Sequence, residues 1–325
     1  MIMESDGLLH ALLLDGNGGG RDLTWDEINR WNPDEGTLWI HFNYTSENTA
    51  DWLQEKSGLE ALIVEALISE ETRPRSTIIG KGVFMSLRGI NFNPGESYED
   101  MVSVRIWAEE HRIITTRKRQ LLSVTDIAKQ LRQNCGPETT SQLIIEISDL
   151  LTSYIEEAVE RIEDKTIELE EQVMSSHDST LRTRISSIRR DAIIIRRYLA
   201  PQREAITRMH VDSVAWITEK DKRHLHEIAN ILIRTVEDLD SIRDRASVAR
   251  EELTNALSAQ LNSRMYVLSI ITAIFLPLSF FTGLFGVNIG GIPGATFKWA
   301  FSIFILFLIG VCVCQYIYFR KKGWI

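Results

Sequence analysis

Two uncharged apolar runs near the C-terminal end constrain the fold more than any other feature. Residues 265–285 and 299–319 contain no Asp, Glu, Lys or Arg. A helix of about 20 residues crosses the roughly 30 Å hydrocarbon core of a bilayer, and each run has that length. We therefore predict two membrane-spanning helices joined by a short loop over residues 286–298, with the upstream chain forming a soluble body.

Basic residues flank the two runs on one side only. Arg264 precedes the first run, and Arg320, Lys321 and Lys322 follow the second, whereas the connecting loop carries only Lys298. Lys and Arg are retained on the cytoplasmic side, so both termini and the soluble body are expected in the cytoplasm. The N-terminal residues lack a basic segment followed by an apolar core, so no secretory signal is expected.

The composition argues against several function classes. Asp and Glu number 45 and Lys and Arg 36, a net charge of −9, so we expect no nucleic-acid partner. The three cysteines form no disulfide framework, and no Cys/His cluster has zinc-finger spacing. No nucleophile–base spacing or phosphate loop is present, so the chain is not expected to be an enzyme.

Residues 1–136 predict a mixed α/β domain. Short β-branched and aromatic runs alternate with helical segments over 50–55 and 60–69, which indicates a sheet covered by helices. The predicted strands are residues 8–14, 38–42, 83–88, 102–107 and 112–116.

A glycine-rich segment over residues 15–20 admits two interpretations. A phosphate cradle would need the Lys-Ser/Thr pair of a P-loop or the glycine spacing of a dinucleotide fingerprint, and neither is present. A hairpin turn after the first strand is favoured.

Residues 137–264 predict helices only. Residues 141–174 are rich in acidic side chains and 179–200 in arginine, which favours an antiparallel hairpin with complementary surfaces, and Pro201 should end or kink its second helix. A third helix begins near Thr218 and meets no breaker until Pro277. It would be about 90 Å long at 1.5 Å per residue and would continue into the bilayer.

The long helix has two distinct faces. An apolar face at a spacing of three and four includes Leu232, Leu239, Ile242, Ala246, Ala249, Leu253, Ala256 and Leu257. The opposite face carries the acidic residues Glu237, Asp240, Asp244 and Glu251, and continues through the first span as Met265, Leu268, Thr272, Leu276 and Ser279.

This second face has a functional and an ordinary interpretation. Acidic groups raise the local cation concentration and hydroxyls can bond the water shell of an ion, so the face is suited to a cation path. An acidic solvated face and membrane Ser or Thr are also common without any such role. One chain with two spans cannot enclose a channel, so a path needs several copies around an axis. The second span, with only Ser302 and Gln315 as polar residues, would then face lipid.

Residues 280–288, Phe-Phe-Thr-Gly-Leu-Phe-Gly-Val-Asn, resemble the end of the first span in the CorA superfamily of divalent-cation transporters. The family's usual Gly-Met-Asn is Gly286-Val287-Asn288 here, a variant that is similar to the zinc-transporter (ZntB) branch. Segments 14–19, 39–44, 72–75 and 196–203 resemble that branch in the same order, so the resemblance covers nearly the whole chain.

The resemblance implies a funnel-shaped homopentamer with an α+β cytoplasmic domain, a long helical stalk and two C-terminal transmembrane helices. The first span would line the pore, and Asn288 in the Gly286–Asn288 ring would hold a hydrated cation at the outer mouth, although Asn also commonly ends a helix. It further implies zinc uptake across a bacterial inner membrane, coupled to protons, with the transported cation in place of any cofactor. Glu237, Asp240, Asp244 and Glu251 are the candidate proton carriers.

Some features leave alternatives open. Val287 replaces Met, and the spans lack the His or carboxylate ligands that zinc prefers, so a magnesium, cobalt or nickel channel, zinc efflux and a membrane-tethered scaffold remain alternatives. Met265 is either a weak thioether ligand or a packing or gate residue, and His224 and His226 are expected at the surface. Pro277 should bend the first span and free a carbonyl toward the lumen.

Overall fold

The computed structural model describes residues 7–71, 73–96, 100–176, 178, 180–211, 214–286 and 297–323. They fall into two compact units, Met1–Glu251 and Glu252–Ile325.

The strands are β1 (Leu8–Leu14), β2 (Gly20–Asp22), β3 (Thr37–Asn43), β4 (Arg75–Ile79), β5 (Gly82–Gly89), β6 (Val102–Ala108) and β7 (Arg112–Arg117). The helices are α1 (Trp25–Arg30), a 3-10 turn (Pro33–Glu35), α2 (Glu47–Glu55), α3 (Ala61–Ile68), α4 (Leu122–Arg132), α5 (Thr140–Ser175), α6 (Leu181–Val211), α7 (Glu219–Phe285) and α8 (Ala300–Lys321).

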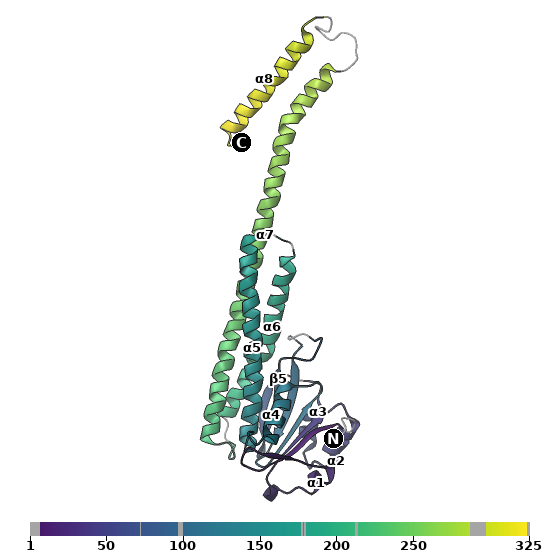
Figure 1. The fold of residues 1–325 in the computed structure, drawn as a ribbon, viewed down its shortest axis with the longest axis vertical. Helices are drawn as coiled ribbons and strands as arrows, with labels where there is room; N and C mark the ends of the chain where they lie inside the picture. The colour runs from purple at the N-terminus through teal and green to yellow at the C-terminus, as the bar shows by residue number, and fades with distance from the viewer. Residues whose placement is uncertain are drawn as a thin grey trace. The chain divides into compact units, whose positions relative to one another are not determined.

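The first unit is built on one mixed sheet of seven strands in the order β2-β1-β3-β7-β6-β5-β4 (Figure 1). Only β3 and β7 are parallel, and every other neighbouring pair is antiparallel. The five predicted strands are confirmed to within two residues at each end. The short strands β2 and β4 and the helices α1 and α4 were not predicted, because each is too short or too polar to show a period.

The glycine-rich segment forms the hairpin turn between β1 and β2. The Asp15 carboxylate accepts hydrogen bonds from the backbone N–H of Asn17 (2.8 Å) and Gly19 (2.9 Å). Gly16 and Gly18 have φ of 76° and 87°, in the left-handed region where a side chain would be strained. The turn interpretation is confirmed, and the same hydrogen bonds occupy the N–H groups that a phosphate would need.

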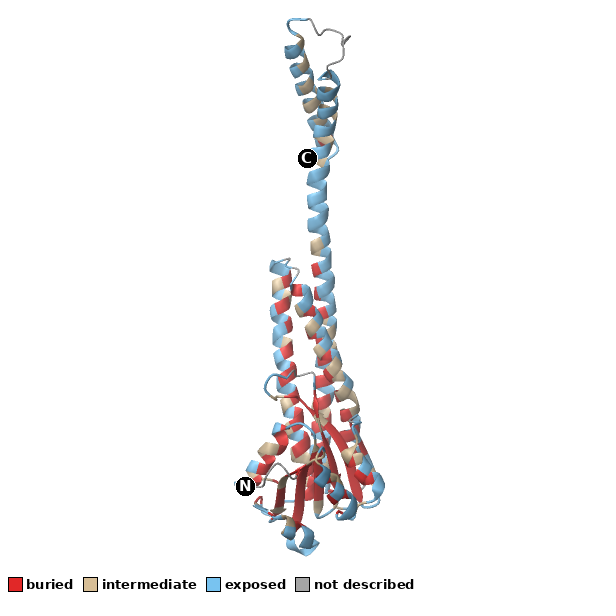
Figure 2. Cartoon of the chain, turned by 90° about the vertical axis from the view of Figure 1, so that its right-hand side faces the viewer, coloured by how far each residue is buried: buried red, intermediate tan, exposed pale blue. Residues whose placement is uncertain are grey.

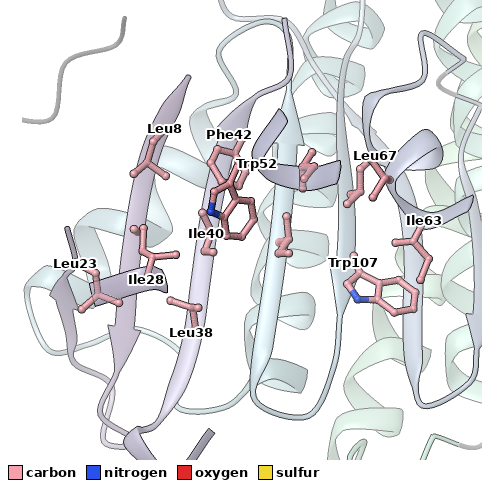
Figure 3. Close-up of a cluster of buried hydrophobic side chains, with 14 of the residues drawn as sticks. Leu8, Leu23, Ile28, Leu38, Ile40, Phe42, Trp52, Ile63, Leu67 and Trp107 are labelled. Atoms are coloured by element: carbon pink, nitrogen blue, oxygen red, sulfur yellow. The ribbon is translucent and has the colours of Figure 1, made fainter. Parts of the chain in front are cut away.

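One face of the sheet packs against α1, α2 and α3. Figure 3 shows apolar side chains of this layer, with Phe42 beside Trp52 and Trp107 near Ile63 and Leu67. The ring centroids of Phe42 and Trp52 are 5.2 Å apart. The inner strands β3, β5 and β6 are buried along nearly their whole length, and Figure 2 shows the buried strands of the sheet in red, because helices cover the sheet on both faces.

The other face packs against α4, α5 and α6. Two side-chain bonds fix α6 on the sheet edge: Ser76 Oγ donates to the Ala205 carbonyl (2.8 Å), and Gln202 Oε1 accepts from the Arg88 N–H (2.7 Å). Helix α6 continues through Pro201 to Val211, so of the two predicted alternatives, an end or a kink at Pro201, the end is wrong. Neighbouring packing outweighs the one backbone hydrogen bond that proline removes.

Helices α5 and α6 and the first part of α7 form a bundle with an apolar interior (Figure 1). The predicted apolar face of α7 is confirmed from Leu232 to Leu253, where all six predicted residues are buried, whereas Ala256 and Leu257 at its end are only partly buried. The start of α7 near Thr218 is confirmed as well. Thr218 and Asp221 exchange hydrogen bonds in the first turn, and Ser141 of α5 donates to the same Asp221 carboxylate (2.9 Å).

Charges join the bundle helices at its surface. Arg245 of α7 makes a two-pronged pair with Glu170 of α5, with nitrogen–oxygen distances of 2.9 and 2.6 Å. Arg184 of α6 lies 3.5 Å from Glu168 of α5, the expected pairing of the basic helix with the acidic one. Such pairs contribute about 1 kcal/mol at most, so the apolar interior holds the bundle together.

The second unit has a different character, because its large apolar side chains are exposed. It contains the last part of α7, up to Phe285, and α8. Both helices are long and apolar enough to cross a membrane, and their apolar windows are unburied within the chain. The two runs of the sequence are thus confirmed as helices of membrane-spanning length.

Candidate functional site

The predicted pore-lining residues lie together on one face of α7. Met265, Leu268 and Leu276 are 65%, 64% and 67% exposed, and Thr272 and Ser279 are exposed between and above them. On the rule of 100° per residue these five positions cluster on one side of the helix. We call them the uncovered stripe, because no other part of the described chain packs on them.

Helix α8 covers the opposite side of α7. Phe307 meets Phe281 edge-on at a ring distance of 5.1 Å, and Phe304 lies 5.3 Å from Phe285. Ala273 and Pro277 are partly buried on the same side. Since α8 occupies this side only, the two helices of one chain leave the uncovered stripe free to face water or another copy.

The hydroxyl groups in this part of α7 donate into their own helix. Thr272 Oγ1 donates to the Leu268 carbonyl and Ser269 Oγ to the Met265 carbonyl, both at 2.8 Å. A hydroxyl whose proton is engaged this way keeps two lone pairs for acceptance. Thr272 therefore presents an acceptor on the uncovered stripe, and an acceptor suits the water shell of a cation.

The carbonyl freed by Pro277 lies on the side facing α8. Proline has no N–H, so the Ala273 carbonyl four residues earlier has no helical donor. Gln315 Nε2 of α8 donates to this oxygen at 3.2 Å. The freed carbonyl is thus directed away from the uncovered stripe, and the expectation that it faces the lumen is wrong.

The Gln315 contact was missed from the sequence, where this residue was assigned to a lipid-facing helix surface. A lone Gln in an otherwise apolar span was the available signal, because such a side chain needs a partner in hydrocarbon. The partner was not deducible, since it depends on which turn of α8 lies beside Pro277.

The Gly286-Val287-Asn288 motif is described only at its first residue. The Gly286 N–H donates to the Thr282 carbonyl at 2.9 Å, and a Cβ on Gly286 would lie 2.8 Å from that oxygen. A side chain here would have to displace the last turn of α7, which explains a glycine at this position. Val287 and Asn288 lie outside the described residues.

The acidic residues of α7 do not form one uniform face. Glu237, Asp244 and Glu251 are exposed. Asp240 lies instead between helices, with Arg196 Nε of α6 at 2.7 Å and Arg243 Nη1 at 3.0 Å. The assignment of Asp240 to a solvated stripe is corrected, because the tertiary fold brings the basic helix α6 against it.

No group of three or more His, Cys, Asp or Glu side chains is arranged to hold a metal ion among the residues that the structure describes. His224 and His226 are exposed, as predicted. The ring of His226 also lies 4.9 Å from that of His210 on α6, a pairing across two helices that the sequence did not show.

Two other histidines are packed inside the first unit, Met1–Glu251, which contains the sheet and which we call the sheet unit. His41 of β3 is buried, its Nδ1 lies 2.8 Å from Thr115 Oγ1, and its ring stacks on that of His10 at 5.9 Å. Burial, reinforced by Arg132 and Arg117, lowers the pKa of His10 to about 4. Burial also holds the pKa of His41 well below its ordinary value. Both rings are therefore neutral at physiological pH.

Comparisons with known proteins match this architecture along the whole chain. A family described as CorA-like Mg2+ transporter protein matches residues 34–321. The zinc transport protein ZntB of Yersinia enterocolitica is 33% identical over 98% of this chain and 96% of its own length. The divalent cation transporter CmaX of Pseudomonas aeruginosa is 35% identical over 99% of this chain and 98% of its own length.

Solved structures agree with the sequence relatives. The structure of the full-length CmaX protein superposes with a TM-score of 0.88 at 34% identity, covering 100% of both chains. Two helices of membrane-spanning length at the C-terminal end, the long helix α7 that includes the first of them, and a family match over residues 34–321 all indicate the same family. The chain belongs to the CorA family of divalent-cation transporters, and it is a transporter and not an enzyme.

Proposed function

We propose that this chain is the subunit of a homopentamer that carries zinc through a pore on its five-fold axis, across a bacterial inner membrane. The observation that carries the proposal is the uncovered stripe of α7, whose residues stay exposed while α8 covers the opposite side. With five copies around an axis, the stripe would face the centre and α8 would face lipid.

The chemistry of the stripe supports passage of a hydrated ion. Its groups are a thioether, two hydroxyls and two leucines, and none of them binds a divalent cation tightly. Weak neutral groups allow an ion to leave as well as enter, which conduction requires. In this proposal Asn288 forms the outer mouth, holding the ion through its water with amide oxygens.

Zinc is proposed as the cargo because the ZntB relatives carry that name and Val287 replaces the methionine of the family's usual motif. A second candidate is magnesium, cobalt or nickel through the same architecture. The description of the matching family as Mg2+ transporters favours that alternative.

The proposed topology follows the flanking charges. The cytoplasmic part consists of an α/β domain over residues 1–136, a helical stalk over 137–264 and a short tail over 320–325. The membrane is spanned by residues 265–285 and 299–319, which are joined by an outer loop over 286–298. We propose uptake as the direction of transport and a proton gradient as the driving force. Glu237, Asp244 and Glu251 are the exposed candidate carriers, of which Asp244 pairs with Arg243 at 2.9 Å. Asp240 is partly buried and pairs with Arg196 as well as Arg243.

Metal-selective flux into liposomes tests this proposal. We expect zinc entry that rises when the inside is made alkaline relative to the outside, and that Mg2+, Co2+ and Ni2+ compete with only weakly. Strong competition by Mg2+ would favour the second candidate, and no metal entry at all would leave only a membrane-tethered scaffold.

Two variants localise the path. Asn288→Ala should lower zinc entry about tenfold or more, because one amide is lost from each of the five subunits. Phe301→Ala on α8, a position 76% exposed and assigned to lipid, is the matched control and should leave entry unchanged. A wild-type flux in the Asn288→Ala protein would contradict the assigned mouth.

A variant set addresses the proton carriers. Glu237→Gln, Asp244→Asn and Glu251→Gln, alone and together, should flatten the dependence of zinc entry on the pH gradient if they carry protons. An unchanged pH dependence in the triple variant would remove these residues from the mechanism.

A further inference from the structure

The backbone of α7 has one unmet hydrogen-bonding requirement inside the first span. In a helix the N–H of residue 277 would donate to the carbonyl of residue 273, but Pro277 has no N–H. A carbonyl without a donor is costly in hydrocarbon, since water is not available to replace it. Residue 273 therefore needs a donor from outside its own helix.

Gln315 of α8 supplies that donor. Its Nε2 lies 3.2 Å from the Ala273 oxygen, and Gln315 is partly buried on the side of α8 that faces α7. The other uncharged polar side chains of α8 that carry a hydroxyl, Ser302, Tyr316 and Tyr318, are exposed. One amide thus meets the one carbonyl that the proline leaves free.

The Gln315–Ala273 contact lies in the part of α7 that carries the proposed transport path. In the same turns of α7, Thr272 and Leu276 of the uncovered stripe lie about 100° and 60° around the helix from Ala273. Above Pro277, the ring pairs Phe281–Phe307 and Phe285–Phe304 hold the next two turns on α8. The direction of the segment that ends at Gly286 therefore depends on how the proline turn is fixed.

We propose that Gln315 is a positioning residue for transport, which fixes the proline turn of α7 by donating to the Ala273 carbonyl and so sets the stripe and the Gly286 end of the helix. The inference rests on the proposed function of the stripe. Gln315 touches no ion in this account, and its effect passes entirely through the backbone of α7. Its remaining amide oxygen, Oε1, is buried without a hydrogen-bond partner in the described chain.

A double-mutant cycle separates this role from simple packing. Gln315→Leu removes the donor, and Pro277→Ala restores an N–H that can satisfy residue 273 within the helix. In the wild-type background we expect Gln315→Leu to lower the zinc transport rate about threefold, and by no more than about twentyfold. These factors correspond to the average and the largest free energies of interhelical hydrogen bonds in membranes. In the Pro277→Ala background the same substitution should change the rate less than about 1.5-fold, because the donor is no longer needed.

The matched control is Ser302→Ala, which removes another polar side chain of α8, at an exposed position. It should have the same small effect in both backgrounds. An equal effect of Gln315→Leu in both backgrounds would overturn the proposal, because packing alone predicts additivity.

A second readout uses protonation. In Gln315→Glu the protonated carboxyl can donate to the Ala273 oxygen, whereas the carboxylate cannot and repels it. We expect the rate relative to wild type at the same pH to be near one at acidic pH and to fall about threefold as the carboxyl ionises. A ratio that does not change with pH would contradict the hydrogen-bond role.

The cycle also has an arm that does not depend on transport. The thermal midpoint of the purified full-length protein in detergent should show the same coupling between positions 277 and 315. If the wild type carries no metal while the midpoints are coupled, the proposed function fails and the backbone contact stands. If the wild type carries zinc and the midpoints and rates are additive, the inference fails and the function stands.

Discussion

The sheet unit and the unit of residues 252–325 use the same kinds of apolar side chain in opposite ways. Phe42 of β3 is fully buried, whereas Phe280 of α7 and Phe301 of α8 are 64% and 76% exposed. In the first unit the chain removes its own apolar surface from water, with helices on both faces of the sheet. In the second, two helices alone cannot do so, and lipid or another copy must cover what remains.

The two regions also differ in how they satisfy polar groups. The sheet unit buries whole polar side chains and pairs some of them across neighbouring strands, as with Trp39 Nε1 of β3, which donates to Thr115 Oγ1 of β7 at 2.9 Å. In the unit of residues 252–325, Gln315 of α8 donates a side-chain hydrogen bond to the Ala273 carbonyl of α7 at 3.2 Å. A polar group without a partner costs more in hydrocarbon than at a surface that water reaches, so the one proline-freed carbonyl of α7 needs a donor from α8.

The largest expected effect tests burial directly. Phe42→Ala should lower the stability of the sheet unit by about 3–5 kcal/mol, because it opens a cavity against Trp52. Phe301→Ala, which deletes the same atoms from the exposed surface of α8, should change stability in detergent by less than about 1 kcal/mol. Thermal unfolding followed by tryptophan fluorescence measures both. Similar losses in the two variants would remove the contrast between the regions.

The next effect tests whether the exposed surface of α8 meets lipid. Ile309→Arg places a charge at the middle of the second run and should cost about 2.5–3.5 kcal/mol of insertion, so that little protein reaches the membrane fraction. Ser258→Arg, at an exposed position of α7 ahead of the first run, is the control. Normal membrane recovery of the Ile309→Arg protein would mean that this surface faces water or protein.

A smaller effect distinguishes the units by pH. The folded pKa of His10 is about 4, below the ordinary value of 6.5, so between these values the unfolded chain binds the proton that the folded chain excludes. Stability of the sheet unit therefore falls as the pH drops from about 6.5 to 4, while the spans, which contain no Asp, Glu or His, do not respond.

His10→Gln should reduce this acid-dependent loss by about 1 kcal/mol, a value discounted because the ring is partly exposed. The change in thermal midpoint between pH 7 and pH 4.5 is the measurement, with His224→Gln on the exposed surface of α7 as control. An identical midpoint shift in wild type and His10→Gln would show that other groups govern the acid response.

The smallest effect concerns the bundle surface. Arg245→Gln removes the two-pronged pair with Glu170 between α7 and α5, and should cost about 0.5–1 kcal/mol, less at high salt. Arg161→Gln, whose partner Glu157 lies one turn away on the same helix, should cost less than about 0.5 kcal/mol. A salt-independent loss in Arg245→Gln would indicate packing of its aliphatic stem and not its charge.

Most elements of the fold followed from local pattern. The strand over residues 8–14 and the start of α7 after Thr218 were predictable because a run of apolar residues or a capping pair fixes them within a few positions. The strands β2 and β4 were not, since a three-residue strand such as Gly20–Asp22 exists only because β1 lies beside it. The pairing of β3 with β7 likewise joins segments about 70 residues apart.

The sequence by itself determined the two helices of membrane-spanning length, the helical stalk, the stripe along α7 and the family, because each depends on the length, period or order of residues along one chain. Only the tertiary structure decided that Asp240 pairs with Arg196 and that the carbonyl freed at Pro277 turns toward Gln315. Both depend on which turn of a second helix lies alongside, and the period of one helix does not encode its register against another.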